Sequence, residues 1–283
     1  MNFHKSPATH VSHVKINVSD MKEALNFYTG LLGFNVLEQN GKDVQLTADD
    51  KTSILSIHQP ENPIEKKRTS GLYHFAILLP ERADLAAITI HLAKNDVRLG
   101  ASDHLVSEAL YLNDPDGNGI EIYRDREPEE WSWNGSRVEM TTDPLDFENL
   151  VESLEEGQEW QGMPEGTVMG HLHLHVSDMP SAVKFYTEGL GLKVVAEFPG
   201  QAAFMSSEDY HHHIAVNVWN GIGAPQPEPG SVGLNEFIMN YPDEASLNAA
   251  AKRLEDLGHE VISKDGTTVS YDPSGNKAIL TTE

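Results

Sequence analysis

Histidine residues recur at the same place in three similar segments of the sequence, where they could bind a metal ion. His13, His74 and His171 each lie near the start of a short run that contains alternating apolar residues, as in 171–176, His-Leu-His-Leu-His-Val. Alternation with a period of two is typical of a β-strand, and it places the histidines of that run on one face and the apolar residues on the other. Neutral imidazoles gathered from several such strands would be good metal ligands.

Glu121 is the candidate carboxylate ligand. It lies between two isoleucines in 119–123, Gly-Ile-Glu-Ile-Tyr, where an ionised side chain costs free energy unless it is paired or binds a metal. The chain has no cysteine, which leaves histidine and carboxylate as the plausible ligands. Two imidazoles and one carboxylate on one side of a metal are typical of non-haem Fe(II) oxygenases. A single histidine more often faces water, but three at equivalent positions beside this glutamate favour a metal site.

An internal repeat supplies the elements that position these residues. Residues 18–33 return as residues 176–191, with ten of sixteen positions identical. A weaker match relates 71–80 to 233–242, and the turn 114–118, Asp-Pro-Asp-Gly-Asn, has a later counterpart in Asp-Pro-Ser-Gly-Asn. Repetition at a fixed spacing indicates copies of one structural unit. We therefore predict two long halves, each made of two units.

Each unit has the pattern of one strand, one helix and three further strands. In the unit 168–220 a helix follows the first strand, with Ser177 or Asp178 as its N-cap. Three short strand-like runs bounded by turn residues come next. They span 193–198, 202–205 and 212–218.

The predicted fold class is α+β, with four βαβββ modules forming two open β-barrel cups. The helix of a module covers one face of its sheet, and two modules side by side curl around the other face. The histidine-bearing face of each first strand would then line a cup. The modules span roughly 8–65, 70–125, 168–220 and 231–283, within two regions at 8–125 and 168–283.

Residues 126–167 join the two regions. They include an acidic stretch, 143–157, in which Leu150, Val151 and Leu154 form a modest apolar stripe. This pattern predicts a surface helix. We interpret the segment as an acidic linker that straps the halves together rather than as part of the catalytic machinery.

The composition argues against several classes of partner. The formal charge of −24 repels phosphate backbones and anionic lipids, so we expect no nucleic acid and no membrane as partners. Residues 1–10 contain no apolar run of the signal-peptide kind, and no stretch approaches the ~20 apolar residues of a membrane span. We expect a cytoplasmic protein. A homo-oligomer is compatible with the sequence, which leaves the oligomeric state open.

Four motifs resemble those of the vicinal-oxygen-chelate (glyoxalase/bleomycin resistance/dioxygenase) superfamily. They are Gly-His-Leu-His-Leu-His-Val-Ser-Asp at 170–178, His-His-His-Ile-Ala-Val at 211–216, Asp-His-Leu-Val-Ser at 103–107 and Tyr-Leu-Asn-Asp-Pro-Asp-Gly-Asn-Gly-Ile-Glu at 111–121. Nearly the whole chain resembles the type I extradiol dioxygenases, in particular the catechol 2,3-dioxygenases of the bacillus type. The resemblance implies cleavage of catechol or a substituted catechol by O2 at a non-haem Fe(II) site, with Mn(II) or another divalent metal as the alternative.

The resemblance also implies roles for individual residues. The metal ligands of the family fall on His74, His171 and Glu121. Its acid–base histidine, in a His-x-x-Ala-aliphatic run, falls on His212, a role suited to a group that titrates near neutrality. The groups that would hydrogen-bond the substrate are His104 and Tyr111.

The fourth unit departs from the family pattern. Typical two-domain members carry the whole set in the C-terminal half, but this chain has Glu236 and Ile279 where the histidine and the glutamate are expected. We therefore predict that units two and three pair, so that the ligand set spans the middle of the chain. If units one and two paired instead, His13 would replace His171, but Thr52 would then stand where the acid–base histidine belongs.

Some alternatives stay open. Strict alternation back from Asn217 points His211 and His213 inward and His212 outward, so His212 requires a strand bulge and His213 is the alternative acid–base residue. Glyoxalase-type isomerases and thiol transferases use the same cup and the same kinds of ligand. A non-enzymatic small-molecule-binding cup needs no ligand set, so the His-His-Glu set argues against it. The sequence does not determine which catechol fits.

Overall fold

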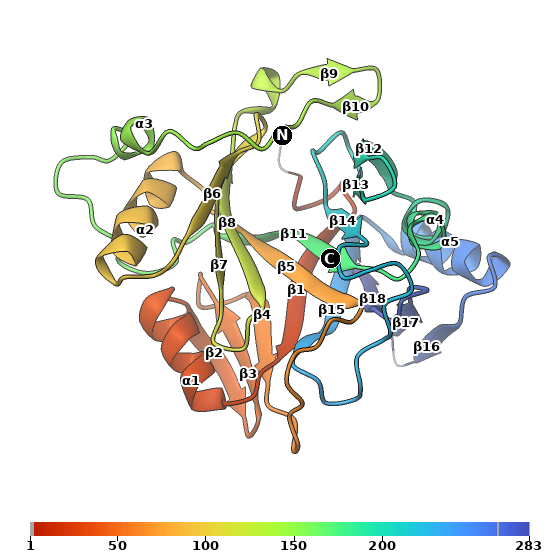
Figure 1. Cartoon of the computed structure of the whole chain (residues 1–283). Helices are drawn as coiled ribbons and strands as arrows, with labels where there is room; N and C mark the ends of the chain where they lie inside the picture. Colours follow the sequence, from red (N-terminus) through yellow and green to blue (C-terminus); the bar gives the residue numbers. More distant parts are fainter. Residues whose placement is uncertain (1–2, 265, 283) are drawn as a thin grey trace.

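The computed structural model describes residues 3–264 and 266–282 and has the predicted α+β class. Four strand–helix–three-strand modules follow one another along the chain (Figure 1). Asp265 and Glu283, which belong to the predicted module 231–283, lie outside the described residues.

The elements of the four modules match one another in order. The first module contains β1 (His10–Asn17), α1 (Met21–Leu25) with its continuation η1 (Asn26–Leu31), β2 (Asn35–Asn40), β3 (Asp43–Thr47) and β4 (Ser53–His58). The second contains β5 (Gly71–Leu78), α2 (Arg82–Lys94), β6 (Gly100–Asp103), β7 (Ser107–Asn113) and β8 (Gly119–Asp125). The third contains β11 (Val168–His175), α4 (Met179–Lys184) with η3 (Phe185–Gly189), β12 (Lys193–Phe198), β13 (Ala202–Ser206) and β14 (Ile214–Asn217). The fourth contains β15 (Gly233–Tyr241), α5 (Glu244–Asp256), β16 (Val261–Lys264), β17 (Thr267–Tyr271) and β18 (Lys277–Thr282).

The modules pair two with three and one with four. One eight-stranded sheet has the order β12-β13-β14-β11-β5-β8-β7-β6, and the other has the order β16-β17-β18-β15-β1-β4-β3-β2. The first strands meet in antiparallel pairs, β11 with β5 and β15 with β1. Each sheet thus takes one module from each half of the repeat. The predicted pairing of units two and three is confirmed, and the sequential alternative with His13 as ligand is wrong.

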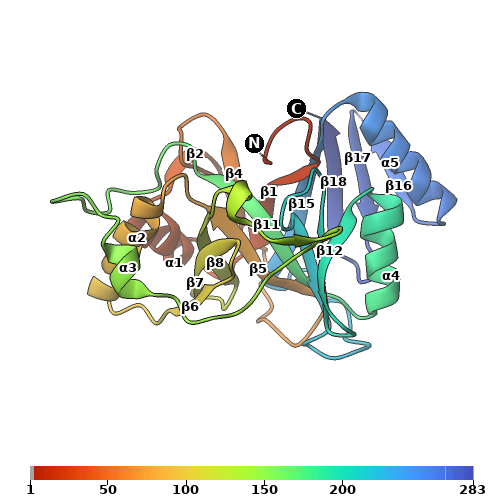
Figure 2. The ribbon, with the colours of Figure 1, turned by 90° about the horizontal axis from the view of Figure 1, so that it is seen from above.

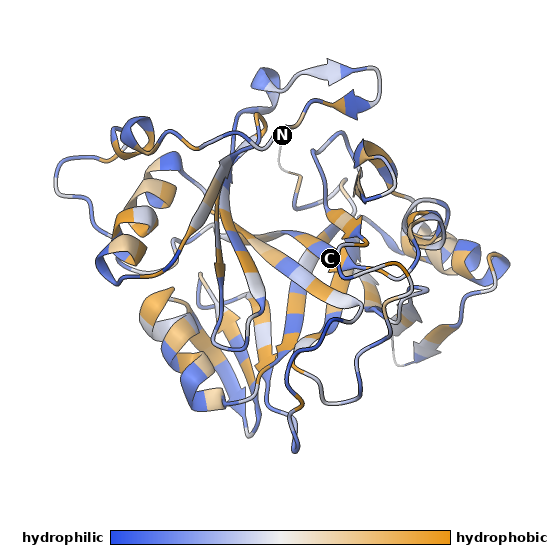
Figure 3. Ribbon diagram, in the orientation of Figure 1, coloured by the Kyte–Doolittle hydropathy of each residue, from blue (hydrophilic) through white to orange (hydrophobic). Residues whose placement is uncertain are grey.

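Helices cover the outer faces of both sheets. Seen from above, α1 and α2 lie on one side of the molecule and α4 and α5 on the other, with the strands between them (Figure 2). Asp178 is the N-cap of α4, because its side chain accepts a hydrogen bond from the backbone N–H of Ser181. The hydrophobic segments in Figure 3 follow the strands and the helix sides that face them.

The linker is less helical than its pattern predicts. Its elements are η2 (Pro128–Glu130), β9 (Trp133–Asn134), β10 (Arg137–Val138) and α3 (Phe147–Val151). The helix α3 ends after five residues, with Leu150 buried but Val151 38% exposed. The Ser153 hydroxyl donates to the carbonyl of Leu150 at this end. The predicted apolar stripe thus contributes one buried side chain, too little for a long helix to be held against the sheet.

Candidate active site

The three predicted metal ligands lie together on the concave face of the sheet from modules two and three. The register aligns Glu121 of β8 with Ala76 of β5, and Ala76 with His171 of β11. His74 lies two residues before Ala76 and therefore points to the same face. The fully buried Ala76 is the spacer in this row, and its methyl group leaves room between the ligand side chains.

Two glycines allow this close packing. A Cβ atom on Gly119 would lie 2.2 Å from the carbonyl oxygen of Tyr73, and one on Gly170 would lie 2.0 Å from the hydroxyl oxygen of Tyr123. Real Cβ atoms do not approach other atoms so closely. Glycine at these two places therefore lets β8 and Tyr123 come against the ligand-bearing strands.

The three side chains fit a divalent cation. His171 Nε2 and His74 Nε2 each lie 3.1 Å from Glu121 Oε2, and the ligand atoms of all three residues lie within 4.8 Å of one another. Ligands at right angles around a metal, with bonds of roughly 2.1 Å, lie about 3 Å apart. His74 Nε2 is also buried without a hydrogen-bond partner. A buried polar atom of this kind is costly unless it binds something, and a cation would satisfy it.

The protonation states suit ligands. Burial alone raises the pKa of Glu121, but the attraction of His171, the hydrogen bond to His171 and the nearby His74 outweigh it and hold the pKa well below its usual value. Burial lowers the pKa of His171 to about 4, although Glu121 opposes this shift. The carboxylate is therefore ionised and the His171 imidazole neutral at physiological pH, as metal binding requires.

A cavity of about 860 Å³ opens beside the ligands. His74 and Glu121 lie in its wall, together with the predicted Tyr111, His104 and His212. His171 is 1% exposed and lies behind the wall, where its ring centroid is 4.0 Å from that of His212. The structure thus brings all six predicted site residues to one place.

His212, and not His213, faces the cavity. Nε2 of His213 donates to the carbonyl of Phe3, away from the ligands. The predicted strand bulge is wrong, because β14 begins only at Ile214 and its ladders show no register shift. The three histidines precede the strand, so strict alternation does not apply to them.

A chain of hydrogen bonds fixes the ring of His212. Nε2 of His211 donates to the carboxylate of Asp125 over 2.8 Å, which leaves its Nδ1 as an acceptor. Nδ1 of His212 lies 2.8 Å from that atom and therefore donates to it. Because this bond uses Nδ1, Nε2 of His212 is the nitrogen that can accept a proton. Burial, then the charges of nearby histidines, lowers the pKa of His212 well below its usual value.

Tyr111 and His104 form a hydrogen-bonded pair. Nδ1 of His104 donates to the carbonyl of Thr141 over 2.6 Å, so its Nε2 accepts from the hydroxyl of Tyr111, also over 2.6 Å. Burial, then the negative charge of Glu121, raises the pKa of Tyr111 well above its usual value. The hydroxyl of Tyr111 therefore keeps its proton, and it lies within hydrogen-bonding reach of His104 and close to the carboxylate of Glu121.

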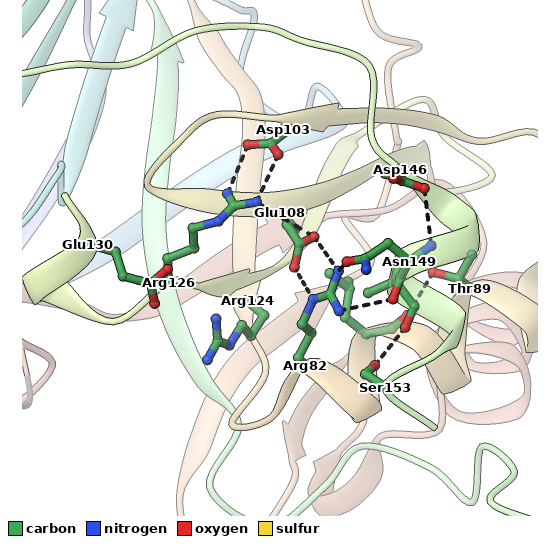
Figure 4. A network of polar contacts seen from close by, with 12 residues as sticks. Arg82, Thr89, Asp103, Glu108, Arg124, Arg126, Glu130, Asp146, Asn149 and Ser153 are labelled. Atoms are coloured by element: carbon green, nitrogen blue, oxygen red, sulfur yellow. Dashed lines mark hydrogen bonds and ion pairs between the residues drawn. The ribbon is translucent and has the colours of Figure 1, made fainter. Parts of the chain in front are cut away.

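The linker contributes to this site, which the sequence did not predict. Residues 137–142 line the cavity, and the carbonyl of Thr141 orients His104. A polar network holds the linker against module two (Figure 4). Its buried centre is Glu108, which accepts two hydrogen bonds from Arg82, and Arg82 in turn donates to Asn149 of the linker helix.

Other residues that line the cavity were also not predicted from the sequence. Tyr73, Phe204 and Trp219 lie in the cavity wall without belonging to any motif. His173 is another lining residue, and here the signal was present, because it shares the strand face of His171. Its Nε2 accepts a hydrogen bond from Asn217, which restricts its ring.

Comparison with known proteins agrees with the fold. The sequence profile of the Glyoxalase/Bleomycin resistance protein/Dioxygenase superfamily matches residues 10–122 and 168–279. The chain belongs to this superfamily. A catechol-2,3-dioxygenase of Bacillus subtilis (strain 168) is 39% identical to it over 273 residues, which are 94% of each chain. The predicted membership is confirmed, and the chain is a catechol-2,3-dioxygenase-like enzyme of the superfamily.

Solved structures of low sequence identity share the fold. A Bacillus subtilis protein matches with a TM-score of 0.67 at 15% identity, covering 97% of this chain and 85% of its own. Glyoxalase I from Zea mays matches with a TM-score of 0.59 at 16% identity, covering 97% of this chain and 92% of its own.

Among the described residues of this superfamily member, no helix is long and apolar enough to cross a membrane.

Proposed function

We propose that this superfamily member is an extradiol dioxygenase that cleaves the ring of catechol or a substituted catechol with O2. One observation carries the proposal: the cluster of His74, Glu121 and His171 opens on a cavity whose wall also holds His212. The extensive similarity to a catechol-2,3-dioxygenase supports it. The proposal includes a cytoplasmic location.

His74, His171 and Glu121 would hold Fe(II), with Mn(II) as the alternative. Bound there, the metal would act as a Lewis acid that acidifies the diol and brings it together with O2. The remaining work falls to the protein. Closely packed strands hold the three ligands in position, and their burial keeps bulk water away from the reacting groups.

His212 would move the proton. Its Nδ1 is held by His211, so its Nε2 would accept the proton of a diol hydroxyl and later return it. The hydroxyl oxygen of Tyr111 would accept a hydrogen bond from the substrate and orient the diol, while His104 holds that hydroxyl in place. The hydrogen bonds that orient His212 and Tyr111 for these roles are already present in the folded chain.

The test is a direct assay for ring cleavage. The purified protein is mixed under air with Fe(II) and with catechol or substituted catechols, and the yellow semialdehyde product is followed by its absorbance. We expect colour with the native protein and none with Glu121→Ala. Parallel loading with Mn(II) compares the two metals. Absence of colour with every catechol, together with turnover of a glyoxalase substrate, would refute the proposal.

A further inference from the structure

The cavity beside the metal ligands continues into an apolar wall. Val138 and Met140 of the linker pack in one cluster with Ala196 of β12 and Phe204 of β13, and all four also line the cavity. The ring centroid of Phe204 lies 5.1 Å from that of His212. The apolar wall, as we call these four residues, thus begins directly next to the acid–base candidate.

The cavity is larger than a bare diol ring requires. Pockets of roughly 300–1,000 Å³ take drug-sized ligands, and this one has a volume of about 860 Å³. A single ring with two hydroxyls, bound at His74 and Glu121, would leave most of this space to water. Water against apolar side chains is unfavourable, so a substituent that displaces it would add affinity.

The charges of the lining disfavour an anionic substituent. Arg137 is the one Lys or Arg among the described lining residues, while Glu139 and Glu197 line the same cavity. Nη2 of Arg137 lies 3.4 Å from a carboxylate oxygen of Glu197, which balances the charge of the guanidinium, although its Nη1 is buried without a hydrogen-bond partner. The formal charge of −24 on the whole chain acts in the same direction.

We infer that the preferred substrate is an uncharged catechol with a bulky apolar substituent, such as an alkyl chain or a second aromatic ring, which lies against the apolar wall. The inference rests on the proposed function, because the diol must bind at the metal ligands. The linker then contributes to substrate choice, because Val138 and Met140 form part of the wall, packed beside β12 and β13. This subsite makes the linker part of the active site.

The test compares three groups of diols with the Fe(II)-loaded protein: catechol, neutral alkyl- or phenyl-catechols, and dihydroxybenzoates of matched size. We expect kcat/KM to rise by about fourfold for each methylene that becomes buried. The kcat/KM of the carboxylated diols should be at least about tenfold lower than that of neutral diols of the same size. Calorimetric titration of the metal-free protein with the same diols measures binding to the wall without the chemistry.

Met140→Gln is the decisive variant, since it keeps the approximate volume of the side chain and makes the wall polar. It should remove most of the preference for apolar substituents in both assays, measured as the ratio of kcat/KM, and of affinity, between alkyl-catechols and catechol. Met21→Gln, on a helix outside the cavity, is the matched control and should change neither.

The outcomes separate this inference from the proposed function. Cleavage of catechol without a gain from apolar substituents, or with a preference for carboxylated diols that Arg137→Gln abolishes, would overturn the inference and leave the function intact. An unchanged preference in Met140→Gln would remove the linker from substrate choice and overturn the inference in that form. Failure to cleave any diol would refute the function itself.

Discussion

The two sheets of the molecule share one architecture but differ in a single row of side chains. In the sheet of modules two and three the row reads His171, Ala76 and Glu121. In the sheet of modules one and four, the same register aligns His13 with Ile238, and Ile238 with Ile279. One histidine is retained, while the small spacer and the carboxylate are both replaced by isoleucine.

The next position differs in the same way. Where the first sheet has His74 beside Gly119, the second has Glu236 and Lys277, whose side chains form a 2.6 Å ion pair. Nε2 of His13 is hydrogen-bonded to Ser56, and the described residues of this sheet contain no cluster of metal-ligand side chains. The backbone alone therefore does not make the site: a few side chains on equivalent strands decide whether a cup can bind a metal or only supports the fold.

The largest expected effect comes from replacing Glu121 by isoleucine, the residue that the other sheet has at the equivalent position. Glu121→Ile removes the charge that balances a cation, so we expect loss of stoichiometric metal and of ring cleavage by well over a hundredfold, beyond the 10–100-fold typical of residues around a ligand. Metal analysis and the catechol assay measure both. Glu236→Gln, in the other sheet, should change neither, and a metal-loaded Glu121→Ile protein would contradict the assignment.

His212→Gln should have the next largest effect. Loss of a positioned acid–base group costs about 10²–10⁴ in rate, so kcat should fall by that factor while metal content stays the same. Thr52, the counterpart in module one, supplies the control as Thr52→Ala, which should keep full activity. If His213→Gln lost turnover and His212→Gln kept it, the assignment would pass to His213.

Ala76→Ile tests the spacer. Extra methylene groups in a packed region cost about 1–3 kcal/mol, and here they would also push the ligand side chains apart. We expect lower stability in urea unfolding and at least about tenfold weaker metal binding. The reverse change, Ile238→Ala, should lower stability by less than the ~2–5 kcal/mol of a fully buried site, because Ile238 is half-buried. Unchanged metal affinity in Ala76→Ile would show that the spacer is unimportant.

Lys277→Met should have the smallest effect. The Glu236–Lys277 pair is partly exposed, with side chains 21% and 31% accessible, and such pairs contribute about 0–1 kcal/mol. We expect a change of that size in the free energy of unfolding and none in metal content or turnover. A loss of activity would mean that the second sheet influences the first.

Much of the fold followed from local patterns. The period-two runs became the first strands, and Asp178 became a helix N-cap as its neighbours predicted. Comparison of repeat positions also brought out His13, His74, His171 and Glu121 as candidate ligands, and the family resemblance placed the ligand set on the last three. Local patterns did not predict the structure of the linker. The stripe of Leu150 and Val151 suggested a longer helix, and nothing in the pattern indicated that the linker lines the cavity.

The sequence by itself determined the modules and the chemical types of the ligands, since strand period, helix caps and side-chain chemistry are properties of short segments. The tertiary structure decided between the two pairings of modules that the sequence offered, because β5 and β11 meet across the whole linker. The same holds for the choice of His212 over His213, which depends on a turn before β14. It holds also for the spacer role of Ala76, which exists only once three strands from distant segments lie in register.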